Sequence, residues 1–211
     1  MGLKVALYSG GKESLYASML EWPIDLYLVL IYEFPRPSPH LINLHAVISS
    51  ATLTGRPIYV VKLTKGKEFI ETVETLKNLN ANVIVAGDVL IEEHLKYMEN
   101  LASESGAKLK EPLWNVDTSE LLIKEVEAGI EYIITGISAK VPTKWLCTYV
   151  NRDNAYDLLN DALKHDFDPI GEYGEYHTQV INSPLFNNKL KCKCIKTYNF
   201  NNYKISFLEL V

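Results

Sequence analysis

The sequence has few of the features that mark an exported or membrane-bound protein. Three cysteines occur in 211 residues, Cys147, Cys192 and Cys194. This is an odd and sparse set for a secreted disulfide scaffold, so we expect a reducing, cytoplasmic environment. No apolar run approaches the length of a membrane span, and the apolar stretch at residues 3–8 is too short for a signal peptide. The sequence therefore predicts a soluble protein with no membrane partner.

Clustered positive charge is also missing. The formal net charge is -5, and the lysines and arginines are scattered along the chain. Such a distribution gives no long-range field that attracts nucleic acid, so we predict no nucleic-acid partner. Cys192 and Cys194 lie in an alternating pattern that places both on one face of a strand, where small apolar side chains pack well. We therefore predict no metal site built from protein side chains alone.

Short apolar runs rich in β-branched residues alternate with longer segments of helical period. This pattern is typical of a parallel sheet covered by helices. With right-handed crossovers the sheet is doubly wound, and its ligand site lies at the carboxyl ends of the strands. The expected strands span residues 4–8, 26–31, 58–63, 83–86 and 132–135.

Helices are expected between these runs, and the pattern changes near the carboxyl end. Helical segments begin near Ser14 and cover residues 43–53, 69–76 and 91–105, with Gly106 as a stop signal. Asp117 and Glu120 resemble a capping box that opens another helix. After residue 138 a helix at 154–164 and a hairpin over 191–208 follow. The sequence thus predicts an α/β nucleotide-binding domain at 1–137 and a smaller mixed α+β domain at 138–211.

One motif lies directly between the first strand and the first helix. Two glycines let the backbone approach a phosphate, the amino end of the helix offers unpaired N–H groups, two serines offer hydroxyls, and a lysine adds a cation. Together they predict a nest for two linked phosphates. The spacing is neither that of Walker A nor that of the dinucleotide fingerprint. The motif is Ser9-Gly10-Gly11-Lys12-Glu13-Ser14.

A second motif gathers carboxylates, a histidine and a hydroxyl within eight residues, Gly171-Glu172-Tyr173-Gly174-Glu175-Tyr176-His177-Thr178. If the segment is extended, Glu175 and His177 share one face, where they could position a proton or an ammonium-like nucleophile. Glu172 precedes the bend, and its direction is not fixed by the pattern. The alternative is a surface pair that braces a turn.

The two motifs together resemble a known family. The first is similar to the SGGxxS loop of the PP-loop ATP pyrophosphatases, and GExGExHT near the carboxyl end is similar to the diphthine–ammonia ligases of archaea and eukaryotes. Shorter matches span nearly the whole chain: His40 with Asn43, Gly55 with Pro57, Gly87 with Asp88, and the segments at 111–114 and 183–186. The chain departs from the family at Glu13, where Asp is usual, and at residues 89–96, where a Tyr- and Arg-containing stretch is usual.

The resemblance implies a ligase that converts diphthine on elongation factor 2 to diphthamide, using ammonia and ATP with Mg²⁺. The carboxylate would be activated as an acyl adenylate, with AMP and pyrophosphate as products. The implied catalytic residues are Glu172, Glu175 and His177. The nucleotide would contact Ser9, Gly10, Gly11, Lys12, Glu13, Ser14, His40, Gly87 and Asp88, and the substrate would contact Tyr173, Gly174, Tyr176 and Thr178.

Two alternatives stay open at this stage. The same loop could serve a PP-loop enzyme with another acceptor, such as tRNA or a small carboxylate, or a non-catalytic ATP-binding sensor. Substrate-dependent release of pyrophosphate separates an enzyme from a sensor, and the identity of the acceptor separates the two enzymes. A homo-oligomer is also left open.

Overall fold

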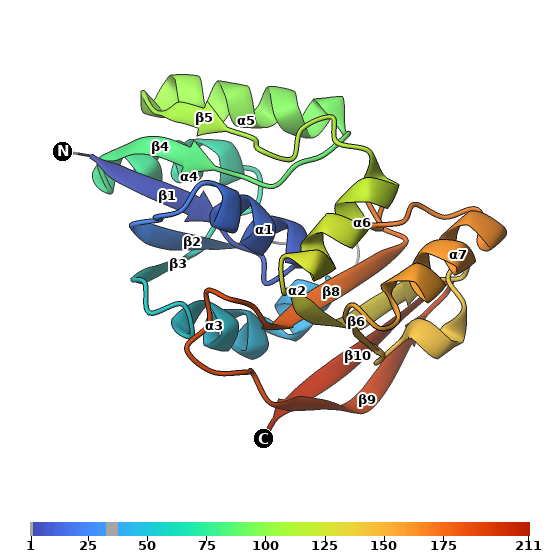
Figure 1. Ribbon diagram of the computed structural model, residues 1–211. Coiled ribbons are helices and arrows are strands. Elements are labelled where there is room, and N and C mark those ends of the chain that lie inside the picture. The colour runs from blue at the N-terminus through green and yellow to red at the C-terminus, as the bar shows by residue number, and fades with distance from the viewer. Residues whose placement is uncertain (1, 33–37) are drawn as a thin grey trace.

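Two β-sheets of different construction organise the chain (Figure 1). The computed structural model describes residues 2–32 and 38–211. The first sheet is parallel, with the strand order β3-β2-β1-β4-β5. Its order reverses between β1 and β4, which is where a doubly wound sheet opens a crevice at its carboxyl edge. The strands are β1 (Leu3–Leu7), β2 (Leu26–Ile31), β3 (Ile58–Lys62), β4 (Ala81–Val85) and β5 (Lys108–Lys110).

Helices cover both faces of this sheet, as the alternating pattern requires. One face packs against α1 (Lys12–Leu20) and α3 (Leu44–Thr52). The other packs against α4 (Glu68–Asn78) and α5 (Glu92–Ser105), whose apolar stripes include Leu76 and Leu101, both fully buried. Because both faces are covered, the strands carry continuous apolar runs. None of the helices in the described ranges has the length and apolar character needed to cross a membrane.

The second sheet is antiparallel and is built from the carboxyl half of the chain. Its strand order is β7-β6-β10-β9, and β8 pairs with β6. The strands are β6 (Glu131–Ser138), β7 (Tyr149–Val150), β8 (Tyr176–Asn182), β9 (Cys192–Phe200) and β10 (Tyr203–Leu210). The helices of this half are α6 (Thr118–Glu127) and α7 (Ala155–His165), with a short 3-10 turn at Thr143–Trp145, and the short α2 (Pro39–Ile42) lies before α3.

The structure confirms the local signals that have a stereochemical cause. Gly106 ends α5 in the left-handed conformation, with φ of 75°. The side chain of Asp117 accepts a hydrogen bond from the Glu120 N–H and caps α6. The expected hairpin forms from β9 and β10.

One expected strand lies in the wrong sheet. The run at 132–135 belongs to β6, which pairs antiparallel with its neighbours, and the fifth parallel position is taken by the three residues of β5. Central strands are buried on both faces in either kind of sheet, and Ile133 and Ile134 are both buried. An apolar run therefore does not reveal its pairing direction, and Lys108–Lys110 is too short to give a period.

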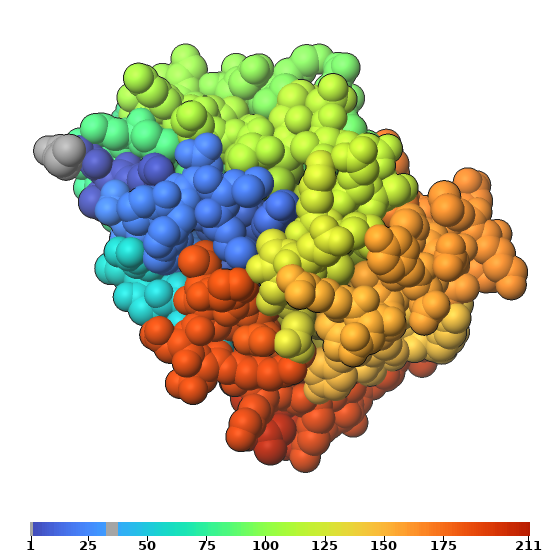
Figure 2. Space-filling model, viewed as in Figure 1, coloured from blue at the N-terminus to red at the C-terminus, as the bar shows by residue number. Residues whose placement is uncertain are grey.

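The two sheets share one hydrophobic core. The largest buried cluster joins Leu15 of α1 and Val85 of β4 to Tyr132 of β6 and Val180 of β8. In Figure 2 the red surface of the carboxyl segment abuts the blue and cyan surface of the amino half. The sheets divide between β5 and β6, whereas the expected domain boundary near residue 137 falls at the end of β6.

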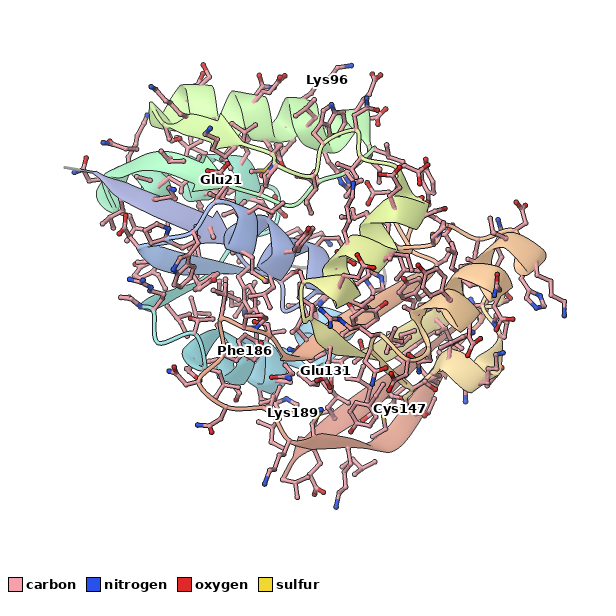
Figure 3. All side chains as sticks on the ribbon, viewed as in Figure 1. Glu21, Lys96, Glu131, Cys147, Phe186 and Lys189 are labelled. Carbon is pink, nitrogen blue, oxygen red and sulfur yellow. A yellow bond between two sulfur atoms is a disulfide. The ribbon has the colours of Figure 1, made fainter. Side chains whose placement is uncertain are left out.

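A disulfide joins Cys147 to Cys194, and this corrects the expectation of cysteines in reduced form. Their Cα atoms lie 6.1 Å apart although 47 positions separate them in the chain. Figure 3 shows Cys147 beside the β9–β10 hairpin. Cys192 is buried and free, and it packs with Cys194 against one apolar cluster as predicted. Only the tertiary pairing of distant segments brings Cys147 into reach, so sequence spacing gave no signal.

Candidate functional site

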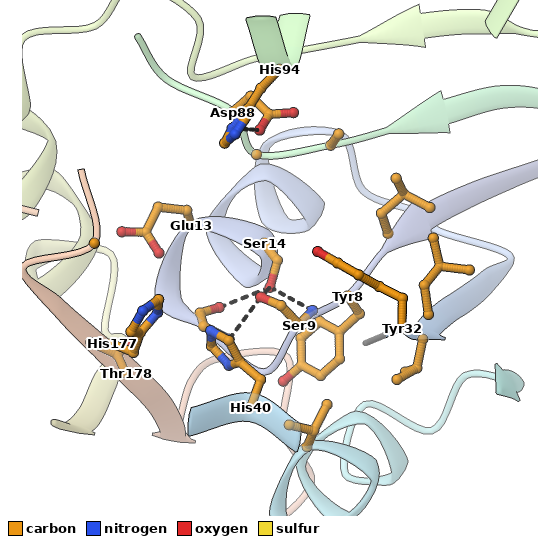
Figure 4. Close-up of a pocket in the computed structure, with 18 of the residues that line it drawn as sticks. Tyr8, Ser9, Glu13, Ser14, Tyr32, His40, Asp88, His94, His177 and Thr178 are labelled. Atoms are coloured by element: carbon orange, nitrogen blue, oxygen red, sulfur yellow. Dashed lines mark hydrogen bonds and ion pairs between the residues drawn. The ribbon is translucent and has the colours of Figure 1, made fainter. Parts of the chain in front are cut away.

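A large cavity opens at the carboxyl edge of the parallel sheet, where the strand order reverses. Its volume is about 970 Å³, and it is lined by the phosphate loop after β1, by α2, by the end of β4 and by residues 170–174 and 176–178 of the second motif (Figure 4). The two motifs lie far apart in the chain and face the same cavity. This agrees with the position at which doubly wound folds bind ligands.

The loop after β1 has the geometry of an anion nest. Gly10 adopts φ of 83°, which favours glycine, and α1 begins at Lys12, so Glu13 and Ser14 of its first turn line the cavity. Ser14 Oγ donates to the Gly11 carbonyl at 2.9 Å and accepts from the Ser9 N–H at 3.3 Å. These bonds hold both hydroxyl groups at the mouth of the helix, where a bound anion is favoured.

Gly87 allows the end of β4 to lie directly against the start of α1. A Cβ at Gly87 would meet the Glu13 carbonyl oxygen at 2.8 Å and the Ser14 nitrogen at 3.1 Å. Both contacts are with backbone, which has little freedom to move. Gly87 and Asp88 line the cavity, and a side chain at Gly87 would displace the phosphate loop.

Lys12 does not line the cavity, contrary to expectation. Its side chain is fully buried, and Nζ donates to the Ile170 carbonyl at 3.0 Å. The same ammonium forms ion pairs with Glu13 and, at 3.7 Å, with Glu125 of α6. Burial lowers the pKa of Lys12 and raises the pKa of Glu125 to about 7, while each charge opposes the shift of the other.

Strand β8 braces the phosphate loop through hydrogen bonds to its backbone. The Val180 N–H donates to the Gly10 carbonyl at 2.8 Å, and Thr178 Oγ1 accepts from the Lys12 N–H at 3.2 Å. Gln179 donates to Ser50 Oγ, which also bonds the Tyr8 hydroxyl. The strand that carries the last residues of the second motif is thus bonded directly to the first motif.

The second motif divides into groups that face the cavity and one that does not. Glu172 and His177 line the cavity. Glu175 is buried outside it, where its oxygens accept from the N–H groups of Asp168 at 3.3 Å and Tyr173 at 3.1 Å. Because β8 begins at Tyr176, Glu175 lies in the preceding bend and does not share a face with His177. In this structure Glu175 braces a turn.

Glu172 also has a fixed environment. Its Oε1 accepts from the Leu90 N–H at 2.8 Å, close to the amino end of α5. Burial is the main cause that raises its pKa, and the nearby Asp88 and Asp168 add to the effect. The carboxylate therefore links the second motif to the segment after β4 while it still faces the cavity.

Four residues expected to bind substrate lie at the cavity wall: Tyr173, Gly174, Tyr176 and Thr178. Tyr173 is 67% exposed and stands at the opening, where its ring is accessible. Tyr176 is buried, and its hydroxyl donates to the Pro169 carbonyl at 2.6 Å. Tyr173 is therefore accessible to solvent, whereas Tyr176 is enclosed.

Two histidines stand together on one side of the cavity (Figure 4). The rings of His40 and His177 meet edge to face, with centroids 5.2 Å apart. Burial lowers the pKa of His40 to about 4, and burial with the neighbouring His40 lowers the pKa of His177 to about 3. Both rings are therefore neutral near pH 7 and offer hydrogen bonds rather than charge. Asn43, which forms a short sequence match with His40, instead anchors β10 by accepting from the Leu208 N–H.

Sequence reasoning missed a third histidine at the opposite side of the cavity. His94 Nδ1 lies 3.3 Å from Asp88 Oδ1, and the hydrogen bond to Asp88 is the main cause that raises the pKa of His94. Glu111 accepts from the Asp88 N–H, and burial with the charge of Asp88 raises the pKa of Glu111 to about 9. The available signal was position: His94 follows Asp88 by six residues, at the start of the helix after β4.

Two family profiles match most of the chain. Residues 2–109 match the family profile of the diphthamide synthase N-terminal domain, and residues 117–209 match that of the diphthamide synthase C-terminal domain. The diphthine–ammonia ligases of Bos taurus and Rattus norvegicus are each 25% identical to the chain, with 88% of this chain and 80% of each relative covered.

Two further matches are partial or distant. The Schizosaccharomyces pombe diphthine–ammonia ligase is 28% identical over 107 residues, which are 51% of this chain but 18% of that longer protein. A Methanocaldococcus jannaschii structure described as a predicted subunit of tRNA methyltransferase aligns with a TM-score of 0.44 and 15% identity, over 87% of this chain and 98% of that one. On the two family profiles, which between them match most of its length, the chain belongs to the diphthamide synthase family.

Proposed function

We propose that this chain is a diphthine–ammonia ligase, which amidates diphthine on elongation factor 2 and splits ATP into AMP and pyrophosphate. The observation that carries the proposal is the shared cavity: the phosphate loop and the second motif face one space although over 150 residues separate them. The names of the two mammalian relatives support the same activity. Membership in the family supports ATP as the cosubstrate.

The loop suits the leaving pyrophosphate. A carboxylate is a poor electrophile, so its conversion to an acyl adenylate gives ammonia a leaving group to displace. Ser9, Ser14 and the loop amides would hold the phosphates, with Gly87 keeping β4 against the loop and His40 beside it. The acceptor would enter past Tyr173, whose ring can face the quaternary ammonium of diphthine. Glu172 and His177 would then orient the acceptor and the attacking amine.

A divalent cation would enter with the nucleotide. No lysine or arginine is found among the described cavity-lining residues, which include Glu13, Asp88 and Glu172. Nor does the described part of the chain hold a group of three metal-ligating side chains. Mg²⁺ is commonly held by one or two carboxylates and by substrate phosphates, and Glu13 of the loop fits that role. When bound, the ion would offset charge on the phosphates.

The proposal is tested by product formation from ATP with ammonium, with and without elongation factor 2 that carries diphthine. We expect AMP and pyrophosphate to appear only when the modified factor is present. A Ser14→Ala variant should bind ATP more weakly, because it removes a hydroxyl at the phosphate position. ATP binding with no turnover on any form of the factor would refute the ligase activity and favour a sensor.

A further inference from the structure

Apart from its ion pair with the neighbouring Glu13, the ammonium of Lys12 is enclosed by groups from the carboxyl half of the chain. Nζ lies 5.4 Å from the centroid of the Tyr176 ring and 5.8 Å from that of Tyr132. It donates to the Ile170 carbonyl and pairs with Glu125 at 3.7 Å. Lys12 and Glu125 are both fully buried, so solvent does not screen the pair.

These contacts connect the first motif to the second. Ile170 directly precedes the Gly171–Thr178 motif, and the Lys12 backbone N–H is already bonded to Thr178. The lysine therefore meets both ends of the second motif, one through its ammonium and one through its amide. We propose that Lys12 is a positioning residue, which fixes the phosphate loop against the second motif and α6 and does not itself contact the phosphates.

Turning the Lys12 ammonium toward a phosphate would break its ion pair with Glu125, which costs free energy. Both carboxylate oxygens of Glu125 are buried, and within the described structure neither has a hydrogen-bond partner, so the ion pair with Lys12 is their compensation. Removing Lys12 leaves the buried Glu125 uncompensated, and removing Glu125 leaves the buried ammonium with Glu13 as its ion-pair partner, so both changes are destabilising. The glutamate thus holds Lys12 away from the cavity, and the loop relies on its amides and serines.

This inference rests on the proposed use of ATP only for its functional part, since the buried pair exists without nucleotide. The first test is a double-mutant cycle on unfolding, with Lys12→Met, Glu125→Gln and the double variant. Each single variant should lower Tm by about 10 °C, and the double variant should regain more than half of that loss. Lys124→Met is the matched control, because Lys124 forms an exposed pair with Glu120 and should leave Tm unchanged within about 2 °C.

The second test measures ATP affinity and turnover below the unfolding transitions. The double variant should bind ATP within about threefold of the parent, whereas loss of a direct charged contact would cost about tenfold or more. Its kcat for amide formation should fall about tenfold or more with KM for ATP little changed, because the second motif is no longer held in register with the loop.

Several results would overturn the proposal. These are additive Tm losses, an ATP affinity that falls about tenfold in both variants lacking Lys12 while Glu125→Gln is unaffected, or full kcat in a folded Glu125→Gln variant. Absence of ATP binding in the parent would instead refute the proposed function, and the unfolding cycle would still decide whether the pair couples the two motifs.

Discussion

Burial sets the charge of the histidines that face the phosphate loop. His40 and His177 are neutral in the folded chain because water is excluded from their rings. A neutral imidazole can donate one hydrogen bond and accept another, which suits a site that must orient an amine. His94, held by Asp88 on the other side, has its pKa raised instead. The cavity is therefore lined by two histidines whose pKa is lowered and by one whose pKa is raised.

The pH dependence of the free energy of unfolding should reveal that His177 is neutral in the folded chain. The folded pKa of His177, about 3, lies below its ordinary value of 6.5, so between these pH values the unfolded chain binds a proton that the folded chain does not. This stability is present above about pH 6.5 and is lost as pH falls. Between pH 7 and pH 5 the free energy of unfolding of the parent should fall by about 2 kcal/mol more than that of a His177→Gln variant. Urea unfolding at both pH values measures the difference.

A matched control is His165→Gln, because His165 is exposed at the end of α7. The free energy of unfolding of this variant should change with pH as that of the parent does. Parallel pH profiles for the parent and the His177→Gln variant would contradict a neutral, buried His177.

At the scale of elements, the site depends on close approach between β4 and α1. Sequence analysis located these elements because apolar period and glycine position have local causes. It did not locate Glu175 or Lys12 correctly in space. Glu175 is turned by the Asp168 and Tyr173 N–H groups of its own bend, a local geometry that the extended reading of the segment missed. Lys12 is turned by Glu125 and Ile170, which are distant in sequence. Local pattern thus predicts the strand and helix that carry a motif better than it predicts where each side chain points.

The approach at Gly87 can be tested directly. Gly87→Ala places a methyl group against the Glu13 carbonyl and should push the loop from β4. We expect a loss of stability of about 1–3 kcal/mol and a weaker affinity for ATP, measured by calorimetry. Gly106→Ala is the control: it strains a left-handed residue with open space around it, so it should destabilise the chain without changing ATP affinity. Equal ATP affinity in the Gly87→Ala variant would contradict the packing argument.

At the scale of the whole molecule, two sheets are tied into one unit. The largest apolar cluster spans both halves, and β8 of the second sheet is bonded to the phosphate loop of the first. The alternating pattern of the sequence stops near residue 138, and the apolar cluster continues past that point into both halves of the chain. The chain should therefore unfold as one cooperative unit.

This expectation is checked by following unfolding with two probes, far-ultraviolet circular dichroism and tryptophan fluorescence. Trp22 and Trp145 lie in different halves, and Trp145 is buried in the shared cluster. The two transitions should coincide, and adding ATP should shift both together. Two separate transitions, with only one moved by ATP, would show that the halves are independent.

The most direct test of the central claim follows isotopically labelled ammonium into elongation factor 2. The purified chain is incubated with ATP and factor that carries diphthine, and the modified peptide is analysed by mass spectrometry. The account predicts label in a new amide, formed in equal amount with AMP and absent without ATP. AMP formation without label in the factor would show that the loop activates another acceptor.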